Sequence, residues 1–193
     1  MSADPHARQG LALVGTRGTG KSTVGRILAG RLARPFLDAD DELERKLGRP
    51  IAALFAQEGE PWFRDWEERI LSELTTNHPR AVLATGGGVV LREGNRRALR
   101  SFGQVVWLRA DPGVASARLQ ADGRGVERRP ALTAAGTLAE IAAVLEARTP
   151  LYRAVADAVV DTSGRTADDV ADAILDVWGM HPARTATTGF EKS

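Results

Sequence analysis

The residues from Gly15 to Ser22 read GTRGTGKS and match the pattern G-x-x-x-x-G-K-[ST]. Glycines in such a loop let the backbone wrap around a phosphate group, so that successive N–H groups point at its oxygens. A short apolar run precedes the loop and a helical pattern follows it, so a helix dipole would add to the attraction. Lys21 would supply a point charge for the β- and γ-phosphates, and the Ser22 hydroxyl a ligand for Mg²⁺. The loop therefore predicts a site for a nucleoside triphosphate with Mg²⁺, and by itself it says nothing about the acceptor.

The predicted nucleotide contacts within this loop and the start of the next helix are Gly18, Thr19, Gly20, Lys21, Ser22 and Thr23. A glycine-rich turn without function is the alternative interpretation. The required context, a strand before the loop and a helix after it, favours the phosphate site.

Carboxylates follow the second predicted strand, in the order Asp38, Ala39, Asp40, Asp41. Open α/β sheets bind ligands at the carboxyl ends of their strands, so these acids should face the same crevice as the loop. Residues two apart at a strand end can point the same way. We therefore expect Asp38 and Asp40 to work together, one near the metal and one near an acceptor hydroxyl, unless Asp40 or Asp41 only caps the next helix.

Three consecutive glycines, Gly86, Gly87 and Gly88, follow the third predicted strand. Such a run is costly in conformational entropy and removes side chains, which indicates that another group approaches the backbone closely. A flexible turn is the alternative. The chain lacks the Asn/Thr-Lys-x-Asp motif that usually reads guanine, which argues against GTP as the nucleotide.

The elements that must position these residues alternate between short apolar runs and longer amphipathic stretches, a pattern typical of a parallel sheet covered by helices. The predicted strands are Leu11–Val14, Pro35–Leu37, Ala81–Ala84, Val105–Leu108 and Ala158–Val160. The predicted helices are Lys21–Ala33, Asp40–Leu47, Ile51–Glu58, Pro61–Thr76, Gly94–Ser101, Pro112–Ala121, Leu138–Ala156 and Ala167–Trp178.

Length and composition fit one domain over residues 1–178 of the 193, with a disordered tail from residue 179. The segment from about 121 to 137 is rich in glycine and charge, which predicts a mobile lid. A net charge of +1 argues against a general binder of nucleic acid or membrane surfaces. The absence of cysteine excludes thiolate chemistry and disulfides. Residues 1–9 carry no apolar run, so a cytoplasmic location is expected, and the chain is expected to be a monomer.

Five segments, taken in order along the chain, resemble the shikimate kinase family. They are GTRGTGKST, FLDADDELERKLGRPIAALFAQEGEPWFRDWEE, ATGGGVV, RRP and RTPLYR. The resemblance runs from about Leu11 to Leu175 and is more specific than the phosphate loop alone. It implies a three-layer α/β P-loop NTPase fold, similar to nucleoside monophosphate kinases, with a five-stranded parallel sheet flanked by helices. It also implies transfer of the ATP γ-phosphoryl group to the 3-hydroxyl of shikimate.

For the acceptor, the resemblance implies that Asp40 bonds the reacting hydroxyl as the candidate base and that Asp38 lies near Mg²⁺. Arg64 and Arg148 would grip the shikimate carboxylate, for which a planar guanidinium is suited. Glu67 would orient Arg64 from one helical turn away. By the same resemblance, Gly86, Gly87 and Gly88 would contact the ring of the acceptor, and Phe55 and Phe63 would wall its pocket.

For the nucleotide, the resemblance implies that Arg129 swings in with the lid and meets the transferring phosphoryl group. The stretch Leu119–Arg128 is longer than usual for the family, so the adenine-stacking arginine is either Arg118 or Arg124, with Arg118 preferred. Arg165 is a further candidate for packing on the base. Two other departures are Ala39, where the family often has Ser or Thr, and Ala131, where it usually has Leu.

Two other functions compete with this interpretation. Another small-molecule or nucleoside monophosphate kinase, such as a gluconate kinase, would keep the phosphate loop but lack the D-x-D and F-R-x-x-E pairs. A non-catalytic binding module of the same architecture would typically lose the loop lysine, the second Asp or a carboxylate-binding Arg. The chain keeps all of these residues.

Overall fold

The computed structural model describes residues 10–121 and 138–179, and in this part of the chain five strands form a single parallel sheet. The spatial order is β2-β3-β1-β4-β5. The strands are β1 (Gly10–Val14), β2 (Phe36–Asp38), β3 (Val82–Ala84), β4 (Gly103–Arg109) and β5 (Ala158–Asp161). The expected strands are confirmed, with boundaries that move by no more than two residues.

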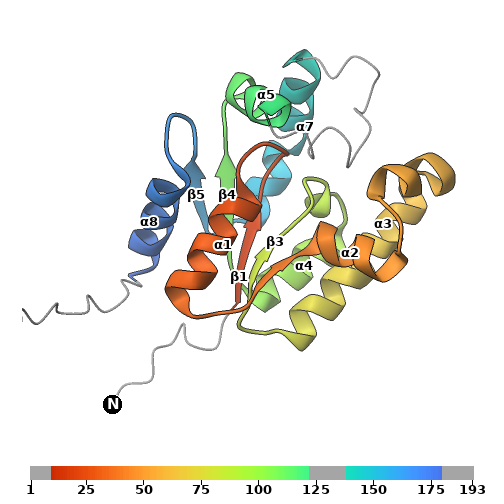
Figure 1. The fold of residues 1–193 in the computed structure, drawn as a ribbon, viewed down its shortest axis with the longest axis horizontal. Helices are drawn as coiled ribbons and strands as arrows, with labels where there is room; N and C mark the ends of the chain where they lie inside the picture. Colours follow the sequence, from red (N-terminus) through yellow and green to blue (C-terminus); the bar gives the residue numbers. More distant parts are fainter. Residues whose placement is uncertain (1–9, 122–137, 180–193) are drawn as a thin grey trace, which may run out of the picture.

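Helices cover both faces of the sheet (Figure 1). They are α1 (Lys21–Leu32), α2 (Ala39–Leu47), α3 (Ile51–Asn77), α4 (Glu93–Phe102), α5 (Pro112–Ala121), α7 (Leu138–Val155) and α8 (Ala167–Trp178). A short 3₁₀ turn, η1 (Val89–Leu91), follows the glycine run and was not predicted. The three-layer α/β class expected from the sequence is confirmed.

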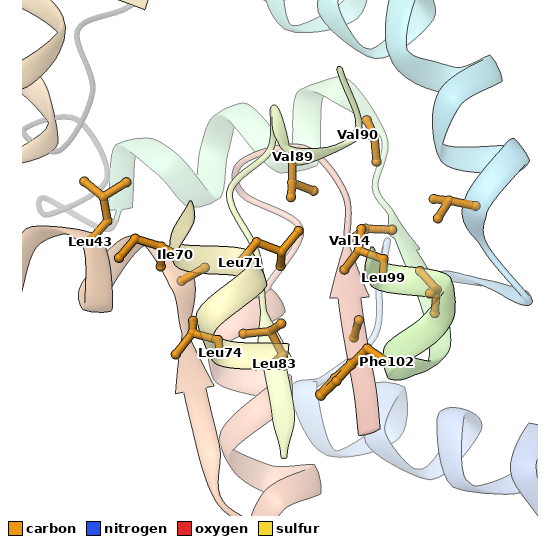
Figure 2. Packing of buried hydrophobic residues seen from close by; sticks show 14 of the residues in the cluster. Val14, Leu43, Ile70, Leu71, Leu74, Leu83, Val89, Val90, Leu99 and Phe102 are labelled. Atoms are coloured by element: carbon orange, nitrogen blue, oxygen red, sulfur yellow. The ribbon is translucent and has the colours of Figure 1, made fainter. Parts of the chain in front are cut away.

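The sheet divides the hydrophobic core into two clusters, because successive residues of a strand point to opposite faces of the sheet. Leu11 and Leu13 belong to a cluster with α1 and α8, whereas Ala12 and Val14 belong to one with α2, α3, α4 and α7. Figure 2 shows the second cluster, in which Leu71 of α3, Leu83 of β3 and other side chains converge on the sheet. Because both faces are buried, the strands read as continuous apolar runs in the sequence.

Helix α3 is interrupted at Gly59, whose φ of 81° and ψ of 169° are not helical. The sequence predicts two helices here, with a gap between Glu58 and Pro61, and the break at Gly59 accounts for that gap. The helix resumes at Pro61, where the missing N–H is tolerated because the first N–H groups of a helix have no partner within it. The break sets the position of Glu60, which lies between the two parts.

Two of the expected segments, the lid over about 121–137 and the tail from 179, lie almost entirely outside the described residues. Helices α5 and α7, which flank the former, pack against each other beyond the carboxyl end of the sheet (Figure 1). In the described part of the chain, none of the helices has the length and apolarity needed to span a membrane.

Candidate active site

Three loops that carry the predicted chemistry meet at the carboxyl edge of the sheet. The phosphate loop follows β1, Asp38 ends β2, and the glycine run follows β3. Since β2, β3 and β1 are adjacent and parallel, these three segments are brought to neighbouring positions. A Cβ added to Gly87 would lie 3.4 Å from the Gly15 oxygen, so the glycine run lies directly against the phosphate loop.

The glycines of the phosphate loop are required by its backbone conformation and its close neighbours. Gly15, Gly18 and Gly20 have φ values of 144°, 77° and 87°, which other residues rarely adopt. A Cβ on Gly15 would lie 2.3 Å from the Leu108 oxygen, and one on Gly18 would lie 2.4 Å from the Ala115 oxygen. The loop is thus wrapped tightly between β4 and α5.

The N-terminus of α1 fits an anionic ligand. Its cap residue Gly20 provides no side-chain hydrogen bond, and its first turn contains no acidic residue. By contrast, α8 is closed by a capping box between Thr166 and Asp169. At α1 no acidic residue of the first turn competes for the backbone N–H groups and the positive end of the dipole, which suits a phosphate site.

Lys21 and Thr19 lie inside the loop itself. The Lys21 ammonium donates to the carbonyls of Gly15 at 2.9 Å and Thr16 at 2.7 Å. The Thr19 hydroxyl donates to the same Thr16 oxygen at 2.9 Å. The positive charge is thereby held in the concavity formed by the loop, where a phosphate would bring its own negative charge.

Asp38 and Ser22, the two residues predicted at the metal, are in direct contact. The Ser22 hydroxyl donates to Asp38 Oδ2 at 2.5 Å, joining the start of α1 to the end of β2. Asp38 Oδ1 also accepts from the backbone N–H groups of Asp40 and Asp41, at 3.1 and 3.4 Å. The capping residue of α2 is thus Asp38, and the alternative interpretation, in which Asp40 or Asp41 only caps the helix, is wrong.

The spacing argument that linked Asp38 to Asp40 is also corrected. Asp40 lies in the first turn of α2, not at the end of an extended strand, so the two-residue alternation of strands does not apply to it. Its half-buried side chain is carried by the start of the helix, near the positive end of the dipole. Asp40 still lies at the same edge of the sheet as the phosphate loop, because α2 starts where β2 ends.

Burial raises the pKa of the Asp38 carboxyl, and repulsion from Asp40 and Asp41 raises it further, against the hydrogen bond from Ser22. The folded state therefore holds this proton more tightly than the unfolded chain does. Ionised Asp38 lowers the stability of the folded protein above the raised pKa, and this loss disappears as the pH falls below the ordinary value of 3.8. A nearby cation would offset the same repulsion.

Replacing Asp38 with asparagine is therefore expected to leave the ligand-free protein as stable as the wild type, or more stable, at neutral pH. Asparagine is an equally good helix cap and its oxygen can still accept from Ser22. The advantage should shrink as the pH falls toward 3.8. The same variant should lose most of the extra thermal stability that Mg²⁺ gives in the presence of ADP. Thermal melts with and without Mg²⁺·ADP measure both effects.

Asp41→Asn provides the matched control, since it removes a neighbouring charge but keeps the Asp38 carboxylate. It should retain the full response to Mg²⁺. An undiminished Mg²⁺ response in Asp38→Asn would remove Asp38 from the metal site.

The glycine run is closely approached by Arg64, which confirms that part of its prediction. A Cβ on Gly88 would lie 2.3 Å from one terminal nitrogen of Arg64 and 2.4 Å from the other. Any larger residue at this position would have to displace the guanidinium from where it lies. The glycine run therefore contacts Arg64 through Gly88 and the phosphate loop through Gly87.

Arg64 is buried, with 6% of its surface exposed, and two carboxylates of the same helix hold it. Glu67, itself buried, accepts from Nη1 at 2.7 Å. Glu60 accepts from Nε at 3.1 Å and from Nη2 at 2.9 Å, both through its Oε1. Burial alone would lower the pKa of Arg64, but these partners more than offset it and raise that pKa above its ordinary value. The predicted contact with Glu67 is confirmed; the contact with Glu60 was missed, although its spacing of four residues was a signal.

Two aromatic rings pack beside Arg64. The ring centroids of Phe55 and Phe63 lie 4.3 Å apart, and the Arg64 guanidinium carbon lies 5.2 Å from the centre of the Phe63 ring. Phe63 is fully buried and Phe55 partly exposed. Both predicted wall residues are thus next to the guanidinium, where their faces stabilise its charge.

Arg148 reaches the glycine run from α7. Its Nη1 donates to the Gly87 oxygen at 3.0 Å, and the buried Tyr152 hydroxyl donates to the same oxygen at 2.6 Å. Tyr152 in turn stacks on Trp107 of β4, with ring centroids 5.4 Å apart. Arg64 and Arg148 are thus brought to consecutive glycines, next to the phosphate loop. Tyr152 was not predicted, and no local pattern links it to a glycine 65 residues away.

The candidates for the adenine side lie beside α5 and the loop after β5. Arg118 donates to the Thr162 hydroxyl at 3.0 Å and to its carbonyl at 2.8 Å. Arg118 shares α5 with Ala115, which contacts Gly18 of the phosphate loop. Arg165 is exposed at the end of the same loop, and its N–H bonds to the Thr162 carbonyl. Both candidates therefore lie at one edge of the site. The alternative, Arg124, lies outside the described residues, as do the predicted lid arginine Arg129 and Ala131.

The parallel sheet, the phosphate loop at the end of β1 and the acceptor-side arginines define a small-molecule kinase of the P-loop NTPase fold. The family model described as shikimate kinase matches residues 17–178. The chain belongs to the shikimate kinase family.

Individual relatives agree with this assignment. The chain is 44% identical to a shikimate kinase of Rhodopirellula baltica, over 91% of this chain and 93% of that one. A solved shikimate kinase from Acinetobacter baumannii, in complex with shikimate, superposes with a TM-score of 0.82 at 39% identity, covering 90% and 94% of the two chains. A gluconokinase from Sinorhizobium meliloti shares the fold, with a TM-score of 0.54 at 17% identity over 88% of this chain and 91% of that one.

Proposed function

We propose that the protein transfers the γ-phosphoryl group of ATP to the 3-hydroxyl of shikimate, giving shikimate 3-phosphate and ADP. The observation that carries this proposal is the convergence of Arg64 and Arg148 on Gly87 and Gly88, which lie against the phosphate loop. Two guanidinium groups in such a place suit an acceptor that carries a carboxylate. A kinase for a neutral sugar has no need of that arrangement, and the assay below distinguishes shikimate from the anionic alternatives.

The donor would be held by the phosphate loop. The glycines and the first N–H groups of α1 would bind the phosphate oxygens of ATP, with Gly18, Thr19, Gly20, Lys21, Ser22 and Thr23 as the contacts. Arg118 and Arg165 would pack against the adenine, and their shared position beside Thr162 supports this role.

Mg²⁺ would be held by Ser22 and, directly or through water, by Asp38. Their mutual contact at 2.5 Å and the raised pKa of Asp38 fit a site that gains from a cation. In the described part of the chain no cluster of three metal-ligating side chains occurs, which suits Mg²⁺ bound chiefly by phosphates and water. When bound, the ion would neutralise charge on the β- and γ-phosphates.

The acceptor would be fixed by its carboxylate on Arg64 and Arg148 and by its ring on Gly86, Gly87 and Gly88. Glu67 keeps Arg64 in place, and Phe55 and Phe63 wall the pocket. Asp40 would then accept a hydrogen bond from the 3-hydroxyl and take its proton as the O–P bond forms. Phosphoryl transfer asks mainly for such alignment, so Asp40 need not be a strong base.

Lys21 would stabilise the charge that develops on the transferring group. Arg129, by the family resemblance, would join it when the lid closes and excludes water, which otherwise competes as an acceptor. The single kinase domain over 1–178, the monomeric state and the cytoplasmic location expected from the sequence stay predictions.

The test is a coupled assay of ADP release with shikimate, gluconate and nucleoside monophosphates side by side. Shikimate should stimulate release at least tenfold more than any of the others, as expected for a member of the shikimate kinase family. A tenfold difference in rate corresponds to about 1.4 kcal/mol. Stimulation by gluconate in its place would assign the site to the gluconate kinase alternative.

A further inference from the structure

Glu60 accepts hydrogen bonds from two donors of Arg64 that could also bind an acceptor carboxylate. Its Oε1 accepts from Nε and Nη2, while Glu67 accepts from Nη1 on the other side of the guanidinium. The edge formed by Nε and Nη2 is one of the two edges at which an arginine binds a carboxylate with two parallel hydrogen bonds. In the described structure this edge is thus occupied by a carboxylate of the chain itself.

The two glutamates differ in how firmly they are held. The Glu67 side chain is 4% exposed, so separating it from Arg64 would break a buried ion pair at a high cost. The Glu60 side chain is 49% exposed and can return to water at little cost. Glu60 is therefore the partner that can be displaced, whereas Glu67 is a fixed part of the site.

The geometry of the Glu60 contact is also weaker than the one that an incoming carboxylate could form. A single oxygen of Glu60 serves both nitrogens, at 3.1 and 2.9 Å. A carboxylate that presents one oxygen to each nitrogen makes the stronger, bidentate pair. Because Glu60 is half-exposed, water screens its pair with Arg64, so the balance favours the incoming ligand.

Charge balance points the same way. With Glu60 in place, the cations Arg64 and Arg148 are matched by Glu60 and Glu67, so a third carboxylate would enter a neutral group. Without Glu60, the two arginines and Glu67 leave one positive charge, which suits one carboxylate ligand. The break at Gly59 comes just before Glu60, so the Glu60 side chain is not held within a regular helix and can move away from Arg64.

From this geometry we propose that Glu60 is an internal competitor for the carboxylate of the acceptor, occupying Arg64 until the substrate displaces it. The inference rests on the proposed function, since it takes Arg64 as the residue that binds the acceptor. In this role Glu60 helps to set the affinity of the site for the acceptor. It also excludes molecules that have no carboxylate, because they cannot displace Glu60 from Arg64.

Replacing Glu60 with glutamine tests the proposal. The variant should lower the KM and the Kd for shikimate by about two- to fivefold, the range expected from removing a half-exposed ion pair that competes with the ligand. kcat and the KM for ATP should stay at the wild-type values. Kinetics by coupled ADP release and binding by calorimetry measure these quantities.

Glu58→Gln is the matched control, because Glu58 lies two residues away, pairs with Arg49 at 3.3 Å and carries the same charge. It should leave the KM for shikimate unchanged. The methyl ester of shikimate, used as a competing ligand, should gain nothing from Glu60→Gln, since it has no carboxylate to place on Arg64. A purely structural effect of the substitution would change both ligands alike.

The outcomes separate this inference from the proposed function. If the wild type shows no shikimate-dependent ADP release, the proposed function fails. If the wild type is active but Glu60→Gln has an unchanged or raised KM for shikimate, or if the ester gains equally, the role of Glu60 as a competitor is wrong.

Discussion

Replacing Asp40 with asparagine is expected to lower kcat by about 10²- to 10⁴-fold, the range for losing a positioned general base. Asp40 stands in the first turn of α2, and its backbone N–H donates to Asp38 at 3.1 Å. Asparagine keeps that backbone bond and the shape of the side chain, so the fold and the phosphate loop should be preserved. The dissociation constant for ATP should therefore stay near the wild-type value. Steady-state kinetics and nucleotide titration together measure the separation.

The size of the loss also distinguishes two roles for Asp40. A loss at the lower end of the range would indicate that the carboxylate mainly aligns the hydroxyl, and a loss at the upper end that it also takes the proton. Asp41→Asn, one residue further in the same turn, is the control and should keep kcat within about threefold of the wild type. Turnover of Asp40→Asn near the wild-type rate would remove Asp40 from the site.

Replacing Arg64 with alanine is expected to raise the KM for shikimate by about 10- to 150-fold, corresponding to the loss of about 1.5–3 kcal/mol from hydrogen bonds to a charged group. The same change removes Arg64 from its buried ion pair with Glu67, which should lower the free energy of unfolding by about 3–5 kcal/mol. Arg64→Lys separates the two effects, since it retains a positive charge for Glu67 but not the planar pair of donors.

The lysine variant should recover most of the stability and little of the affinity for shikimate. Arg69→Ala, which removes an exposed arginine stacked on Trp66 in the same helix, controls for charge and should change neither quantity. Thermal melts and KM determinations on the four proteins measure the pattern. An Arg64→Ala protein that folds and keeps a wild-type KM for shikimate would show that the carboxylate binds elsewhere.

The features that were predicted from the sequence are those with local causes. The phosphate loop is defined by glycines whose φ values are positive, and its order with a strand and a helix can be read along the chain. The strands and helices follow from the spacing of apolar residues, which repeats every two residues in strands and every three to four in helices. Ser22 was assigned to Mg²⁺ by the phosphate-loop motif, and Asp38 by its place at a strand end and by the family resemblance. The structure brings the two into contact.

The features that were missed depend on side chains that meet only in three dimensions. The Tyr152 hydroxyl bonds to a glycine that no spacing rule connects to it. The capping of α2 by Asp38, and not by Asp40, depends on where β2 ends, and helix boundaries are uncertain by one or two residues. Arg64 and Arg148 were chosen by family resemblance, because in an arginine-rich chain composition alone does not indicate which guanidinium binds a ligand.

The position of the transferred phosphate is the most direct measure of the central claim. The protein should be incubated with Mg²⁺, ATP and shikimate, and the product examined by phosphorus NMR with coupling to the ring protons. We expect one new phosphate monoester, coupled to the proton on carbon 3 and formed in equal amount to ADP. Release of ADP with inorganic phosphate alone, or a phosphate on another hydroxyl, would contradict the arrangement in which Asp40 aligns the 3-hydroxyl while Arg64 and Arg148 hold the carboxylate.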